Sequence, residues 1–126
     1  MALWQGKSRR KATGGRLRRG AKKKRREVGR EPVAVAIGND KREAVRVIGG
    51  GSKMRSFKAG RCSVIDSNGK SHQTKILDVL ENRADPHLVR RDVITKGALI
   101  QTELGKVRVT SRPGQVGMVQ GILLSK

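Results

Sequence analysis

The sequence predicts a mainly β protein, a small antiparallel β-barrel of about six to eight short strands preceded by a basic, non-globular N-terminal arm. Charge is distributed unevenly, because residues 1–30 hold 13 basic residues and one acidic residue, whereas residues 31–126 hold 17 and nine. In the second part, short runs of Val, Ile, Leu and Ala alternate with polar residues, as in half-buried strands. Glycine-rich turns separate these runs at close spacing, which is typical of barrels and sandwiches. We therefore expect two domains, an arm at 1–30 and a β-barrel body at 31–126.

The arm has a net charge of +12 and no apolar stripe at helical spacing. Glycines interrupt any helix that its other residues would favour. We expect a segment that is mostly disordered when it is free in solution. Neutralisation of its charges would allow residues 17–28 to form a helical turn or two.

In the first half of the body, four runs have the composition of strands. A Gly-rich loop at 49–53 separates the second run from the third. The third run is either one long strand or two strands that are bent at Gly60. Residues 67–70, Ser-Asn-Gly-Lys, predict a hairpin turn, because Asn-Gly is the strongest short signal for one. The four runs cover residues 32–38, 44–49, 54–66 and 72–82.

The second half of the body begins with a connection at 82–92, in which Pro86 favours a helical turn. Two strands follow, joined by a tight turn at Leu104 and Gly105. Another turn at 112–115 contains Pro and Gly and precedes the last strand. Closure of all these strands into a barrel would remove exposed sheet edges. The three strands of this half are expected at residues 98–102, 106–110 and 116–124.

No combination of side chains in the sequence predicts catalysis or metal binding. His72 and His87 have no obvious carboxylate or cysteine partner, so we expect both to be surface or structural residues. Cys62 is the single cysteine, which allows neither an intrachain disulfide nor a multi-cysteine zinc site. No apolar run approaches the roughly 20 residues that span a bilayer. We expect a cytoplasmic protein without enzyme activity, cofactor, small-molecule substrate, membrane association or homo-oligomer.

The Gly-rich run GGGSKMR, residues 49–55, differs from a nucleotide-binding loop, because Ser52 precedes Lys53 and no helix follows. Two interpretations remain open. The backbone forms a concavity, flanked by Lys53 and Arg55, that holds one phosphate of a larger anion. Alternatively, the run is a plain flexible hairpin loop.

A net charge of +20 in 126 residues indicates a polyanionic partner, and nucleic acid is the first candidate. The only aromatic residues are Trp4 and Phe57, which excludes a sheet that stacks unpaired bases. Recognition of backbone and shape remains, and it fits structured RNA as well as non-specific compaction of DNA. Trp4 either stacks on a base, contacts a neighbouring protein or packs into the body. The arm cations expected to contact phosphates are Lys7, Arg9, Arg10, Lys11, Arg16, Arg18, Arg19, Lys22, Lys23, Lys24, Arg25, Arg26 and Arg30.

Two long motifs follow each other in the chain, WQGKSRRKATGGRLRRGAKKKRREVGRE at 4–31 and VRRDVITKGALIQTELGKVRVTSRPGQ at 89–115. Together they resemble the archaeal and eukaryotic small-subunit ribosomal protein family S8e, and the intervening GKSHQTKILDVLEN resembles its archaeal members. The resemblance implies a structural constituent of the small ribosomal subunit. Its β-barrel would bind small-subunit ribosomal RNA beside neighbouring ribosomal proteins, with the basic arm embedded in the RNA. The matching positions are Trp4–Ser8, Arg10, Thr13–Arg19, Arg90, Arg91, Thr95–Gly97, Arg108 and Thr110–Gln115.

Arg90 and Arg91 are adjacent, so on a strand they would face opposite ways. One of them would then pair with Asp85 or Asp92, while the other meets RNA. The alternative to a ribosomal role is a general nucleic-acid compaction or RNA-chaperone protein, which shares the charge but gives no reason for the long motifs. The body residues expected to contact RNA are Lys53, Arg55, Arg90, Arg91, Lys96, Arg108 and Arg112.

Overall fold

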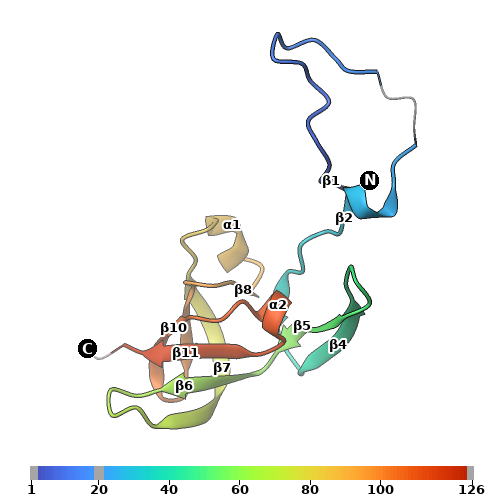
Figure 1. Ribbon diagram of the computed structural model, residues 1–126. Coiled ribbons are helices and arrows are strands. Elements are labelled where there is room, and N and C mark those ends of the chain that lie inside the picture. Colours follow the sequence, from blue (N-terminus) through green and yellow to red (C-terminus); the bar gives the residue numbers. More distant parts are fainter. Residues whose placement is uncertain (1–2, 19–21, 125–126) are drawn as a thin grey trace. The chain divides into compact units, whose positions relative to one another are not determined.

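The computed structural model describes residues 3–18 and 22–124 and is shown in Figure 1. The chain forms two compact units, Met1–Pro32 and Val33–Lys126. Within the described ranges, no helix is long and apolar enough to cross a membrane.

In the first unit, the two ends of the arm pair as short antiparallel strands. Leu3 lies opposite Gly29 and Trp4 opposite Val28 in this pairing. Further along, the backbone N–H of Leu17 donates to the carbonyl oxygen of Arg9 at 2.8 Å, which closes a loop between them. A 3₁₀ turn lies within the segment where the sequence predicts helical turns. The elements are β1 (Leu3–Trp4), η1 (Arg25–Glu27) and β2 (Val28–Gly29).

In the second unit, five strands close into a barrel in the order β10-β11-β6-β7-β9. Four of the five pairings are antiparallel, and the pairing of β6 with β11 is parallel, as the neighbouring arrows in Figure 1 show. The strands are β6 (Arg61–Ile65), β7 (Ser71–Glu81), β9 (Leu99–Thr102), β10 (Gly105–Val109) and β11 (Val119–Leu123).

The barrel interior is filled by small branched side chains that alternate with outward-facing polar ones. Val64, Ile100 and Val107 are fully buried, and Val109 is 1% exposed. Complete burial of such a side chain contributes about 1.5–3 kcal/mol. The unit needs no aromatic residue inside, because five strands leave an interior that Val and Ile can fill.

A second sheet of four strands has the order β4-β5-β3-β8. β5 leads directly into barrel strand β6 through Gly60, so the two sheets share one continuous stretch of chain. Two one-turn helices lie between later strands, and each begins at a proline. These elements are β3 (Val35–Ile37), β4 (Lys41–Arg46), β5 (Ser52–Ala59), α1 (Pro86–Val89), β8 (Val93–Ile94) and α2 (Pro113–Val116).

The predicted fold class, a mainly β protein with a barrel, is confirmed. Four details differ from the expectation. The barrel itself has five strands, because the remaining body strands form the second sheet. The arrangement is not wholly antiparallel as expected, since β6 pairs with β11 in parallel in the barrel and β3 pairs with β5 in parallel in the second sheet. The strand expected at 44–49 lies earlier, at Lys41–Arg46. It pairs with β5 in an exposed hairpin, and such a hairpin does not require apolar residues at alternate positions. The turn expected at 112–115 is the helix α2.

Candidate nucleic-acid interface

The cations of the arm are exposed along its whole described length. The chain provides one acid among residues 1–30, Glu27, and its carboxylate accepts a hydrogen bond from the backbone N–H of Lys24 at 3.2 Å. Arg19 lies outside the described residues. The exposed arm cations are Lys7, Arg9, Arg10, Lys11, Arg16, Arg18, Lys22, Lys23, Lys24, Arg25, Arg26 and Arg30.

Trp4 is half-buried within the arm unit. Its indole Nε1 donates a hydrogen bond to the carbonyl oxygen of Lys7 at 3.0 Å. The guanidinium carbon of Arg9 lies 4.4 Å from the ring centroid, in position for a cation–π interaction. Gly6 also lies against the ring, because a Cβ atom built there would lie 2.5 Å from Cζ2 of the indole. The arm therefore has local structure around the indole ring of Trp4. Stacking of Trp4 on a base stays a prediction.

Lys53 and Arg55 lie on the same face of β5, two residues apart. Lys53 is exposed, whereas Arg55 is half-buried, and its Nε has no hydrogen-bond partner among the described residues. The Gly-rich run before them is a hairpin loop closed by the N–H of Val47 and the carbonyl oxygen of Gly51 at 2.7 Å. A closed hairpin loop is compatible with both interpretations, and phosphate binding there stays a prediction.

The other predicted body cations are exposed but lie on several elements. Arg90 and Arg91 follow α1 in a turn instead of lying on a strand, and no ion pair joins either to a described acidic residue. Asp85 instead caps α1 by accepting a hydrogen bond from the N–H of His87 at 2.8 Å. Lys96 precedes Gly97, whose N–H donates to the carbonyl oxygen of Val109 at 2.7 Å, and this contact places Lys96 close to the end of β10. Arg108 lies on β10 itself, and Arg112 precedes α2.

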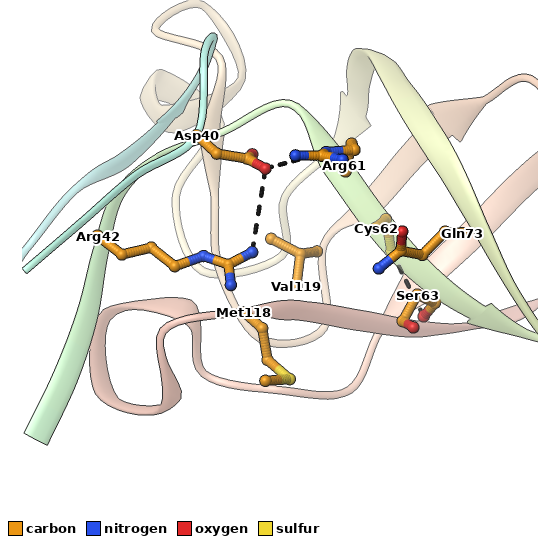
Figure 2. Close-up of a pocket in the computed structure, with 8 residues that line it drawn as sticks. All are labelled: Asp40, Arg42, Arg61, Cys62, Ser63, Gln73, Met118 and Val119. Atoms are coloured by element: carbon orange, nitrogen blue, oxygen red, sulfur yellow. Dashed lines mark hydrogen bonds and ion pairs between the residues drawn. The ribbon is translucent and has the colours of Figure 1, made fainter.

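A cavity of about 210 Å³ lies on the outside of the barrel, at a place that no sequence pattern indicated. Figure 2 shows Arg42 and Arg61 approaching the carboxylate of Asp40 from two sides. The Nε of Arg61 lies 3.1 Å from Oδ2 of Asp40, and Nη2 of Arg42 lies 4.0 Å from the same oxygen. The remaining lining residues are Cys62, Ser63, Gln73, Met118 and Val119.

Two guanidinium groups share one carboxylate here, so the cavity has a net positive charge. The pKa of Asp40 is lowered, mainly by a hydrogen bond from the N–H of Gly60 at 2.8 Å. Burial of the carboxyl opposes this effect, and Arg61 adds to the lowering. Lys75 lies directly opposite Arg61 in the pairing of β6 with β7 and adds a further cation nearby.

No local pattern could have indicated this cluster. Arg42 and Arg61 look like ordinary outward-facing charges of two exposed strands, and they meet only because β5 returns the chain from β4 to β6. Cys62 is buried, and this burial raises the pKa of its thiol to about 11. Such a thiol is protonated at neutral pH and is a poor nucleophile.

His72 has a carboxylate partner that the sequence did not indicate, because its Nε2 lies 3.1 Å from Oδ2 of Asp66. The described ranges contain no group of three or more His, Cys, Asp or Glu side chains that could hold a metal ion.

Comparison with known proteins gives one consistent family. The sequence profile of ribosomal protein S8e matches residues 4–124. Small ribosomal subunit protein eS8 of Methanocorpusculum labreanum is 48% identical over 123 residues, which cover 97% of this chain and 98% of that protein. The eS8 protein of Methanoregula boonei is 47% identical over 124 residues, 98% of this chain and 99% of that protein. The eS8 protein of Methanosphaera stadtmanae is 46% identical over 125 residues, with the same two coverages.

Proposed function

This chain belongs to the ribosomal protein S8e family, and on that premise we propose that it binds and stabilises folded small-subunit ribosomal RNA. The contacts are made to phosphates, by the basic arm and by one face of the barrel. Its relatives bear the name of a small ribosomal subunit protein. The chain is accordingly a structural constituent of that subunit in the cytoplasm, and not an enzyme.

The observation that carries the RNA-binding proposal is the exposure of every described Lys and Arg of the arm. The arm has a net charge of +12 over 30 residues, and its single acid accepts a hydrogen bond from its own backbone. Such a density of exposed cations repels itself unless an anionic surface lies against it. Glycine, alanine, serine and threonine lie between several of the runs of cations, so the backbone can approach closely spaced phosphates.

Phosphate neutralisation supplies the affinity. Each contact releases condensed counterions, so the binding constant falls with salt to a power of about 0.7–0.9 per phosphate. About ten arm contacts would reduce the affinity by about four to five decades between about 50 and 200 mM salt. The electrostatic contribution of phosphate contacts does not distinguish one RNA sequence from another. Selection of one place on the folded RNA therefore depends on the shape of the barrel.

The proposal is tested by purifying the tagged full-length chain from its own cells at about 0.5 M salt and sequencing the nucleic acid that remains bound. We expect small-subunit ribosomal RNA to be enriched, together with proteins of that subunit. A general compaction or RNA-chaperone protein would instead recover DNA or RNA in proportion to abundance and would release it at this salt. That second result would overturn the proposal.

A further inference from the structure

We propose that the cavity lined by Asp40, Arg42, Arg61, Ser63 and Gln73 is a second RNA site, separate from the arm, that holds one unpaired nucleotide. The phosphate of this nucleotide lies against the two guanidinium groups, and its base lies over the neutral side of the cavity. The inference rests on the proposed RNA-binding function and adds a site, with a defined ligand, on the barrel. The lining residues come from β4, β6, β7 and β11 and from the segments that precede β4 and β11.

The size of the cavity limits the ligand. Its volume is about 210 Å³, which is below the roughly 300–1,000 Å³ of sites that enclose a cofactor or a drug-sized molecule. A space of this size suits no more than one nucleotide of a longer strand. The rest of such a strand would continue along the exposed barrel surface, where Lys75 is placed to meet it.

The cationic side of the cavity is arranged to leave donors free. Arg61 contacts Asp40 through Nε, at 3.1 Å, so both of its terminal nitrogens can donate to a ligand. Arg42 reaches the same carboxylate oxygen only at 4.0 Å, which is a weak contact. Asp40 is itself held by the N–H of Gly60, and it therefore fixes Arg61 in place without neutralising both arginines. A phosphate in the cavity would meet at least two guanidinium groups, which favour this ligand through charge and geometry.

The neutral side of the cavity offers groups that suit a base. Ser63 and Gln73 lie directly opposite each other in the β6–β7 pairing, and neither the Ser63 hydroxyl nor the Gln73 amide forms a hydrogen bond with a described residue. Amide and hydroxyl groups hydrogen-bond to base edges. Figure 2 shows Val119 and Met118 between these two residues and Arg42, and Met118 is 40% exposed.

Charge favours RNA over a protein segment as the occupant. Two arginines and a neighbouring lysine surround a single carboxylate, so a basic segment of a ribosomal protein would be repelled. An acidic protein segment would be attracted by the same cations. Chemical probing of the RNA distinguishes these two occupants, because only a bound nucleotide would be protected.

The test measures binding of the full-length chain to a transcript of archaeal small-subunit ribosomal RNA, together with chemical probing of unpaired bases. Two variants keep the Asp40–Arg61 contact and change no charge, namely Ser63→Ile, which fills the cavity, and Gln73→Leu. A third, Arg42→Gln with Arg61→Gln, removes both guanidinium groups. We expect the third to weaken binding by about ten- to hundredfold. All three should abolish protection of the same unpaired nucleotide while the rest of the footprint persists.

Matched controls lie on β4, β7 and β10. Ser71→Ile places the same side chain on exposed β7, and Arg46→Gln with Lys106→Gln removes two exposed charges away from the cavity. The controls should keep the protected nucleotide. If the cavity variants leave the footprint unchanged, or if the controls alter it equally, the inference is wrong. An unchanged footprint is also the result expected for an acidic protein segment. Failure of the unmodified chain to bind the transcript would instead overturn the proposed function itself.

Discussion

The carboxylate of Asp40 accepts a hydrogen bond from the backbone N–H of Gly60 at 2.8 Å, across twenty positions of sequence. This bond ties the residue before β4 to the junction of β5 and β6. Only glycine fits at the junction, because a Cβ atom on Gly60 would lie 2.8 Å from the carbonyl oxygen of Gly38. The other carboxylate oxygen of Asp40 contacts Arg61, so one side chain organises both the bend of the chain and the cationic cavity.

We predict that Asp40→Asn lowers the free energy of unfolding at pH 7 by about 1 kcal/mol, because a partly exposed charge-assisted hydrogen bond becomes a neutral one. The folded-state pKa of Asp40 is below the ordinary value of 3.8. The contribution of the ionised Asp40 carboxylate to the free energy of unfolding is therefore fully present above pH 3.8 and disappears as the pH falls through the folded-state pKa. Urea unfolding at about pH 7, 5 and 3 should show the same difference between the two proteins at pH 7 and 5 and a difference that begins to narrow only at the lowest pH.

Glu103→Gln is the matched control for this prediction, because Glu103 is exposed in the turn after β9. We expect it to leave the stability at neutral pH almost unchanged. A stability difference between Asp40→Asn and the parent chain that is equal at every pH tested would show that the ionised carboxylate is not the cause.

A second prediction concerns the closure of the barrel at Gly121 in β11. A Cβ atom there would lie within 2.4 Å of Cγ1 of Val107 and 2.7 Å from the carbonyl oxygen of Arg108, and the latter is backbone that cannot rotate away. We expect Gly121→Ala to destabilise the body by about 1–3 kcal/mol through overpacking. Thermal unfolding followed by circular dichroism should show a correspondingly lower midpoint.

Gly51→Ala provides the comparison for that experiment. Gly51 lies in the loop after β4, where an added Cβ would meet the Val47 side chain at an ordinary 3.4 Å. We expect little change in its unfolding midpoint. Equal midpoints for Gly121→Ala and the parent chain would mean that β11 and β10 can move apart at no cost.

Local signals in the sequence predicted several bends and turns of the body. Gly60 separates β5 from β6, as expected, and the Asn-Gly turn joins β6 to β7 with a positive φ of 75° at Gly69. The helical turn expected after Pro86 is α1, which is capped by Asp85. In each case the conformational preference of one or two residues decides the structure, so the neighbouring sequence contains the necessary information.

Pairings between distant segments could not be predicted in the same way. Val119 lies beside Cys62 in the parallel pairing of β11 with β6, and nothing in either strand specifies its partner. The cavity depends on this pairing, because Met118 and Val119 line it together with Ser63. The sequence therefore indicates where cations are dense, in the arm, but it cannot show where a few cations are brought together by the barrel.

A third prediction uses Trp4, the only tryptophan, as a reporter of arm structure. An added methyl group at Gly6 would collide with the indole ring, so Gly6→Ala should displace the ring from Arg9 and from the carbonyl oxygen of Lys7. We expect a red-shifted emission maximum and stronger quenching by acrylamide. Gly15→Ala is the control, because its nearest neighbour would be an ordinary 3.8 Å away. Identical spectra for the two variants would indicate that the free arm is disordered around Trp4, as its composition alone suggests.

The last prediction separates the arm from the body. Removal of residues 1–30 takes away a net charge of +12 and leaves the barrel and the second sheet, whose strands all begin after that segment. We expect the circular dichroism spectrum of the body to keep its β character and its cooperative thermal transition. Affinity for a small-subunit ribosomal RNA transcript should fall sharply. The slope of log affinity against log salt should decrease by about 0.7–0.9 for each phosphate that the arm neutralises in the full-length chain.

The cavity at Arg42 and Arg61 remains in the truncated chain, so a weak, less salt-dependent interaction with the transcript should persist. This residual binding should weaken when Arg42→Gln and Arg61→Gln are introduced into the truncated chain, because the body then has no guanidinium group at the cavity. Unfolding of the truncated body would show that the two parts are not independent. An unchanged salt slope would show that the arm does not contact phosphates, since each neutralised phosphate contributes its own share of counterion release.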